Sequence, residues 1–226
     1  MASRSSVALF MGAAVAVAGV CLGAANGKPT LTSAPMGSGA RFAAKPPMKS
    51  PGATEALFRG DMTPDMAVGC DAGPNETATK VTATLLPPFG VVSTTYSIAG
   101  TSGPTWDLVA WDNGASPGSE IQRCPLGAAN GTPGNHTVTV LPGCLTIPAA
   151  AGQTFFFGLS QGTDPIPMTF AMDTSGSTAA TVFIRAPNCG LSSFAPVESI
   201  GFPGYWVHRI IVDDTVPVEL MSFEVN

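Results

Sequence analysis

The chain has 226 residues, including 26 Gly and 21 Pro; 45% of the residues are apolar and only 11% are charged. Disordered chains are usually polar and highly charged, so this composition indicates a folded domain, and its many turn residues favour an all-β one. Residues 61–226 carry four Lys/Arg against fourteen Asp/Glu, a formal charge of −10, which excludes nucleic acid and anionic membrane surfaces as partners because both attract clustered cations.

The first 27 residues have the layout of a secretory signal peptide. A short basic start precedes an apolar run over residues 7–22, and small residues then allow cleavage after Ala25 or Gly27. An uncleaved membrane anchor is the alternative, but 16 residues are fewer than the about 20 that span a bilayer. Lipidation of Cys21 is a second alternative, although Val20 stands where bacterial lipoprotein signals usually carry Gly or Ala. We expect a secreted or cell-surface protein with no membrane contact after cleavage.

Four cysteines remain once the signal is removed: Cys70, Cys124, Cys144 and Cys189. An even number in an exported chain predicts two disulfides, with three possible connectivities. We favour Cys124–Cys144, which closes a short loop, together with Cys70–Cys189, which closes a long one. Free buried thiols are the alternative. A zinc site has less support, because no Cys-x-x-Cys pair is present and neither histidine lies near a cysteine.

The rest of the chain divides into a linker and one domain. Residues 28–60 are basic, rich in Pro, Gly, Ser and Ala and without a sustained period, which predicts a disordered linker. Residues 61–226 show short β-type runs separated by turn residues. We expect an antiparallel two-sheet sandwich, jelly-roll-like, with about ten strands. The expected strands cover residues 78–86, 91–99, 105–112, 119–124, 136–141, 152–160, 167–173, 178–186, 205–213 and 218–225.

Three segments carry a resemblance to a known group of modules: WDLVAWDNGASPG, FFFGL and YWVHRIIV. The pattern is similar to exported bacterial β-sandwich modules that share a W-D-x-G-x-P-G turn, a strand near F-x-G-L and a late W-x-x-R-x strand. The closing VPVELMSFEV resembles a Pro-Val-Glu-Leu segment common in secreted bacterial proteins. These modules have no settled biochemical activity, so the resemblance implies fold and export and leaves the chemistry open.

Aromatic side chains are the first candidates for a ligand site. Trp106, Trp111, Tyr205 and Trp206 would bind sugars if their ring faces were exposed, because ring faces bury apolar C–H surface. Trp106 and Trp111 differ by five positions, so on an unbroken strand they point to opposite faces of a sheet. At least one of these two is therefore expected to lie in the core.

Acidic side chains are the second candidates. Asp112 with Asn113, or Asp213 with Asp214, could supply oxygen ligands to a structural Ca²⁺ ion at an edge of the sandwich. No EF-hand or RTX spacing is present. A solvated turn and a solvated strand end are the plain alternatives, and no other cofactor is expected.

A hydrolase is a third possibility. Residues 158–162 read GLSQG and match the G-x-S-x-G nucleophile pattern. The order Ser160, Asp173, His208 would suit a catalytic triad, but the two prolines that follow the motif oppose the helix that such a nucleophile needs. A strand end followed by a Gly-bearing turn explains the same residues. Metal binding by His136 or His208 has little support, since neither lies in a metal-binding motif.

Three N-x-[ST] sequons, at Asn75, Asn130 and Asn135, lie in expected loops or at a strand edge. They would carry glycans in a eukaryotic secretory pathway and would be incidental in a bacterial one.

Three functions follow in order of preference. The first is a non-enzymatic structural, adhesive or interaction module whose partner is a surface protein or a glycan. The second is a carbohydrate-binding module that uses exposed Trp or Tyr side chains, and the third is a secreted hydrolase.

Overall fold

The computed structural model describes residues 30–36, 52–99, 106–127, 132–162, 169–176 and 179–214. Helical structure in these ranges consists of three 3₁₀ turns: η2 (Ala149–Ala151), η3 (Pro187–Cys189) and η4 (Val197–Ile200). None of the helical segments described is long and apolar enough to cross a membrane.

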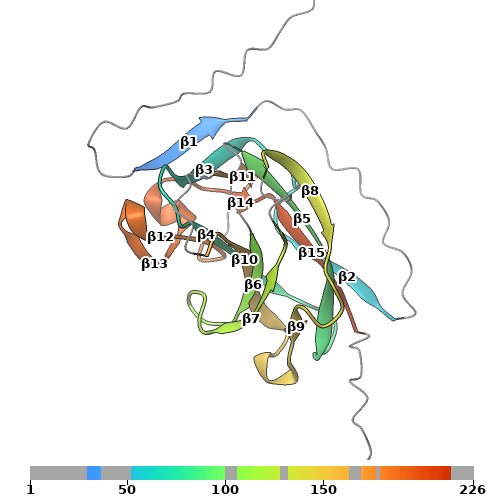
Figure 1. The fold of residues 1–226 in the computed structure, drawn as a ribbon. Helices are drawn as coiled ribbons and strands as arrows, with labels where there is room; N and C mark the ends of the chain where they lie inside the picture. The colour runs from blue at the N-terminus through green and yellow to red at the C-terminus, as the bar shows by residue number, and fades with distance from the viewer. Residues whose placement is uncertain are drawn as a thin grey trace, which may run out of the picture.

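All other regular structure is β-strand, and the strands form two antiparallel sheets (Figure 1). The two-sheet sandwich expected from the sequence is confirmed. The nine-stranded sheet contains β1 (Leu31–Pro35), β2 (Thr54–Phe58), β3 (Met66–Cys70), β5 (Phe89–Ala99), β8 (Gly134–Thr139), β9 (Thr146–Ile147), β11 (Thr169–Asp173), β14 (Tyr205–Trp206) and β15 (His208–Asp213). The six-stranded sheet contains β4 (Glu76–Thr82), β6 (Asp107–Trp111), β7 (Glu120–Pro125), β10 (Thr154–Ser160), β12 (Val182–Ala186) and β13 (Leu191–Pro196).

The order of the strands places distant parts of the chain side by side. The main path of the nine-stranded sheet runs β1-β3-β11-β5-β15-β2, and the six-stranded sheet runs β13-β12-β4-β10-β6-β7. Each predicted strand up to residue 213 has an observed counterpart, although the one expected over residues 205–213 is divided into β14 and β15. The expected strand over residues 218–225 lies outside the described residues.

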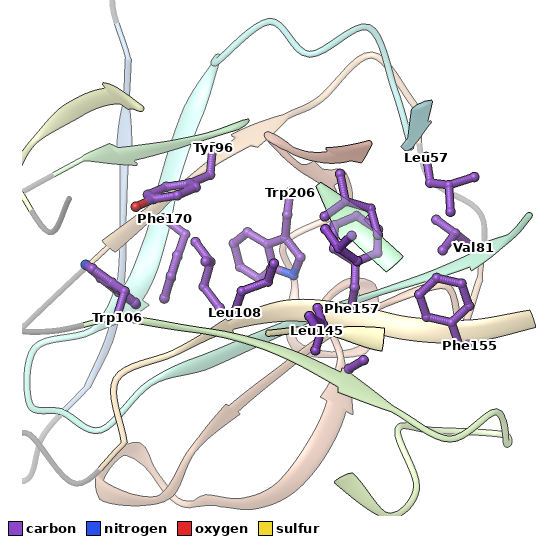
Figure 2. Packing of buried hydrophobic residues seen from close by; sticks show 14 of the residues in the cluster. Leu57, Val81, Tyr96, Trp106, Leu108, Leu145, Phe155, Phe157, Phe170 and Trp206 are labelled. Carbon is purple, nitrogen blue, oxygen red and sulfur yellow. The ribbon is translucent and has the colours of Figure 1, made fainter. Parts of the chain in front are cut away.

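The main core lies between the two sheets (Figure 2). β10 shows how the sequence builds it. Phe155, Phe157 and Leu159 alternate along this strand and belong to the main core, whereas Phe156 points to the outer face of the six-stranded sheet. The same alternation holds in the HTVTVL segment, where Val138 and Val140 pack on the core and Thr137 and Thr139 are exposed.

Two strands lie in the segment that composition suggested to be a linker. β2 pairs with β15, and β1 pairs with β3. The expectation of a disordered segment over residues 28–60 is therefore wrong for these strands. Both are short strands at the ends of the main path, and most of their residues are exposed or half-buried. Each pairs with a strand that is distant in the sequence, so the local sequence gives little indication that these residues form strands.

Both disulfides join the predicted cysteines. Cys70 bonds to Cys189 with Cα atoms 5.9 Å apart, and Cys124 bonds to Cys144 with Cα atoms 5.4 Å apart. The first bond links β3 of the nine-stranded sheet to η3, which directly follows β12 of the six-stranded sheet. It therefore ties the two sheets together covalently.

Candidate functional site

Two of the four aromatic candidates are core residues. Trp106 is fully buried, and its ring meets that of Phe170 edge-on with centroids 5.0 Å apart. Trp206 is buried as well, and its Nε1 donates a hydrogen bond to the carbonyl oxygen of Phe183 at 2.9 Å. Figure 2 shows both indoles within the core. Neither ring offers a face to solvent, so the expectation of an exposed aromatic platform is wrong at these two positions.

The other two candidates lie at the margins. Tyr205 is half-buried at the edge of the main core. Trp111 points to the opposite side of the six-stranded sheet from Trp106, as their spacing predicted. There it packs in a small cluster, which we call the outer cluster, formed by Ala78, Val109, Trp111, Phe156 and Phe183, with Phe194 packed against it.

The acidic candidates lie in two separate places. Asp112 and Asn113 are exposed in the β6–β7 turn of the six-stranded sheet. Asp213 is buried at the end of β15 in the other sheet, and the Asp214 carboxylate accepts a hydrogen bond from the Ala53 amide at 2.9 Å.

No described residue joins either pair as a further acidic ligand. Across the described ranges, the one group of three ligand-type side chains within 4.8 Å is Cys70, Asp71 and Cys189. Its two cysteines form a disulfide, which removes them as thiolate ligands. A calcium ion at Asp112 or Asp213 stays a prediction.

The three residues of the expected triad do not come together. Ser160 lies on the outer face of the six-stranded sheet, where its hydroxyl donates to Glu76 at 2.8 Å and accepts from Arg123 at 3.1 Å. His208 is buried on the inner side, with its Nε2 2.8 Å from the Thr94 hydroxyl and its ring 4.7 Å from that of Phe157. Phe157 and Ser160 project from opposite faces of β10, so the sheet itself separates the serine from the histidine.

The rest of the GLSQG motif also has a structural explanation. A Cβ atom on Gly158 would lie 1.7 Å from the Thr77 carbonyl oxygen, so only glycine fits where β10 meets β4. Gly162 has a positive φ of 64°, which suits a turn. The hydrolase reading of this motif is therefore not supported by the geometry.

Burial lowers the pKa of His208 from 6.5 to about 3. A histidine with a depressed pKa stabilises the fold fully above pH 6.5, and this stability is lost as the pH falls toward 3. Between pH 7 and pH 5 we expect the free energy of unfolding of the wild-type protein to fall by about 2 kcal/mol because of His208. A His208→Gln variant should not show this part of the fall. Urea unfolding at the two pH values measures the difference. His136→Gln, at the half-buried histidine of β8, is the control and should lose as much as the wild type; an equal loss in His208→Gln would contradict the assignment.

One sequon is part of the folded core. Asn75 is fully buried, and its side chain bonds to the Cys70 backbone and to the Gln161 side chain. A glycan cannot be accommodated there. Asn135 is exposed on β8, and Asn130 lies outside the described residues.

A groove of about 300 Å³ lies on the outer face of the six-stranded sheet. Its lining consists of Trp111, residues 116–118 of the β6–β7 turn, Glu120, Arg185 and residues 192–194 of β13. Trp111 and Phe194 meet edge-on with ring centroids 5.3 Å apart, although β12, β4 and β10 lie between their strands in the sheet order. β13 thus reaches over the outer cluster and forms one wall, while the β6–β7 turn forms the other.

The two charged side chains that line the groove, Glu120 and Arg185, each form an ion pair with a residue that does not line it. Arg123 donates to Glu120 at 2.7 and 3.1 Å and also pairs with Asp107 at 2.8 Å. These bonds, the one to Glu120 first, raise the pKa of Arg123 and keep it charged. On the other side, Arg185 pairs with the nearly buried carboxylate of Glu76.

A register row explains why these charges meet. Arg185 faces Glu76 across β12 and β4, Glu76 faces Ser160 across β4 and β10, and Ser160 faces Asp107 across β10 and β6. One polar residue from each of four strands therefore lies in a single line on the outer face.

The sequence identified part of this groove. Trp111 was a candidate, and the Asp-Asn-Gly turn leads into residues 116–118 of the lining. This turn has one residue more between Gly114 and Pro117 than the motif it resembles. Arg185 and the serines of β13 were missed. No local signal marks them, because they join the turn only through the order of strands in the sheet.

Two solved structures share this fold. The crystal structure of the cysteine protease and lectin-like domains of Cwp84, a surface layer associated protein of Clostridium difficile, aligns with 72% of this chain at a TM-score of 0.52 and 11% identity. Clostridial cysteine protease Cwp84 after propeptide cleavage aligns with 72% of the chain at a TM-score of 0.53 and 10% identity. This chain spans only 36% and 40% of those two chains. No family model and no curated protein matches the sequence. Identity at this level shows a common β-sandwich fold and nothing further.

Proposed function

We propose that the protein is an exported, non-enzymatic interaction module that acts at or beyond the cell surface and binds its partner through the groove of the six-stranded sheet. One observation carries the proposal: Glu120 and Arg185, the two charged residues of the groove, are each fixed by a counter-ion that lies outside it. Side chains that are ordered before binding lose little entropy when a partner arrives.

Export is supported by two independent features. The N-terminal segment has the pattern of a secretory signal, and all four cysteines of the folded part are paired in disulfides, as is typical of oxidising compartments. The solved structures that share the fold include a surface layer associated protein, which is the setting that we propose for this chain.

Export is tested by expressing the full chain and measuring the intact mass of the protein recovered outside the cell. We expect a mass that lacks the first 25 or 27 residues and that rises on reduction by the four hydrogens of two disulfides. A retained N-terminus would contradict signal cleavage. No mass change on reduction would contradict export to an oxidising compartment.

Partner binding is tested by labelling the exported protein and measuring its retention on the surface of the cells that produce it. Ser193→Trp places a bulky ring in the groove from an exposed position, so we expect retention to fall about tenfold or more. Thr139→Trp, at an exposed position on β8 of the other sheet, is the matched control and should bind like the wild type. Equal retention of the two variants would contradict the groove as the binding site, and no retention of the wild type would contradict the function.

A further inference from the structure

We propose that the ligand of this groove is a neutral saccharide unit, bound by hydrogen bonds to Glu120 and Arg185 and by contact with the Phe194 ring. This inference rests on the proposed function and names the chemistry of its partner.

The charge of the groove points to a neutral, hydroxyl-rich ligand. The lining contains one acid, Glu120, and one base, Arg185, so its own formal charge sums to zero. Glu120 is ion-paired with Arg123, which Asp107 shares, and Arg185 is ion-paired with Glu76. A charged ligand would have to compete with these ion pairs, whereas a neutral ligand leaves them in place. A carboxylate still accepts and a guanidinium still donates further hydrogen bonds, and a sugar hydroxyl can serve both because it is donor and acceptor at once.

The remaining lining residues suit the same ligand. Ser116, Ser192 and Ser193 are exposed and add hydroxyl groups around the groove. Phe194 is half-buried between Trp111 and the Arg185 guanidinium, which lies 5.1 Å from its ring centroid. The part of this ring that remains accessible offers apolar surface to the C–H groups of a sugar.

The size of the groove limits the ligand. A volume of about 300 Å³ is at the lower end of small-molecule sites, which span roughly 300–1,000 Å³. It accommodates one or two sugar rings, and a longer glycan would be recognised by a terminal or single internal unit.

The test uses the exported protein with both disulfides intact. It is first screened on an array that carries neutral glycans, acidic glycans and peptides, and a neutral hit is then titrated in solution. We expect binding to neutral glycans, weakened about tenfold or more by Glu120→Gln and by Arg185→Met, because each removes a charge-assisted hydrogen bond. Arg59→Met, on the side of the molecule formed by β2, is the control for loss of an arginine and should bind like the wild type.

A further variant separates binding from folding. Phe194→Leu keeps the outer cluster covered but removes the ring, so we expect weaker glycan binding with nearly unchanged thermal unfolding. Binding confined to acidic glycans or peptides, or no binding to any neutral glycan, overturns the saccharide inference. So does a neutral hit whose affinity is unchanged in Glu120→Gln and Arg185→Met. If Ser193→Trp still abolishes retention on cells in these cases, the proposed function stands and only the ligand class is wrong.

Discussion

Replacing Cys70 and Cys189 together with alanine is expected to lower the free energy of unfolding by about 5 kcal/mol. The bond joins residues 119 positions apart, and a cross-link that closes so long a loop removes much entropy from the unfolded chain. The bond between Cys124 and Cys144 closes a loop of 20 residues, so the corresponding double variant should lose only about 3 kcal/mol. Urea unfolding of both variants and of the wild type, without reductant, measures the two losses.

The comparison between the two variants is the decisive part of this experiment. Each removes one disulfide and leaves the other as an internal control. Cys70 also lies where Asn75 bonds to its backbone amide and carbonyl, so local hydrogen bonds remain after the sulfur is removed. A larger loss in the Cys124–Cys144 variant, or equal losses in both, would contradict the explanation that the stabilisation by each disulfide depends on the length of the loop it closes.

Local pattern was sufficient for most of the fold. The alternation in HTVTVL puts Val138 and Val140 on one face, which is the core side in the structure, and the odd spacing of Trp106 and Trp111 placed them on opposite faces. These inferences depend only on the two-residue period of a strand, because successive side chains of an extended chain point to opposite faces. The disulfide pairing was also reached from spacing alone.

The same local rules failed where partners come from far along the chain. β1 and β2 are stabilised by pairing with β3 and β15, and their Pro- and Ala-containing sequences show no strand period of their own. Tryptophan is a residue type that often binds sugars, but the residue type does not reveal which face of a strand is buried, and Trp106 and Trp206 are both buried.

The groove shows this limit most clearly. Trp111 and Phe194 are 83 positions apart in the sequence and belong to strands separated by three others, so only the path of β13 over the outer cluster brings them together. The counter-ions Glu76 and Arg123 come from two further strands. A site assembled from separate strands of one sheet leaves no contiguous motif.

Asp173, the second member of the expected triad, has a structural role that predicts a large effect. Its carboxylate is fully buried and accepts hydrogen bonds from the backbone amides of Asp61, Met62 and Ser175. Gly60 approaches so closely that a Cβ there would lie 2.1 Å from an oxygen of this carboxylate. The Asp173 side chain therefore fixes the course of the backbone between β2 and β3.

Replacing Asp173 with alanine is expected to cost about 3 kcal/mol or more of unfolding free energy, because three donors lose a charged acceptor and the Met62 amide is buried. Asp71→Ala is the matched control: this exposed carboxylate also accepts a backbone amide, that of Thr30, and its removal should cost less than about 1 kcal/mol. Urea unfolding measures both, and amide hydrogen exchange at Asp61 and Met62 reports the local effect. Asp173 belongs to β11 of the nine-stranded sheet, whereas Ser160 belongs to β10 of the six-stranded one. An Asp173→Ala variant that unfolds like the wild type would contradict the role of this carboxylate in holding the backbone turn.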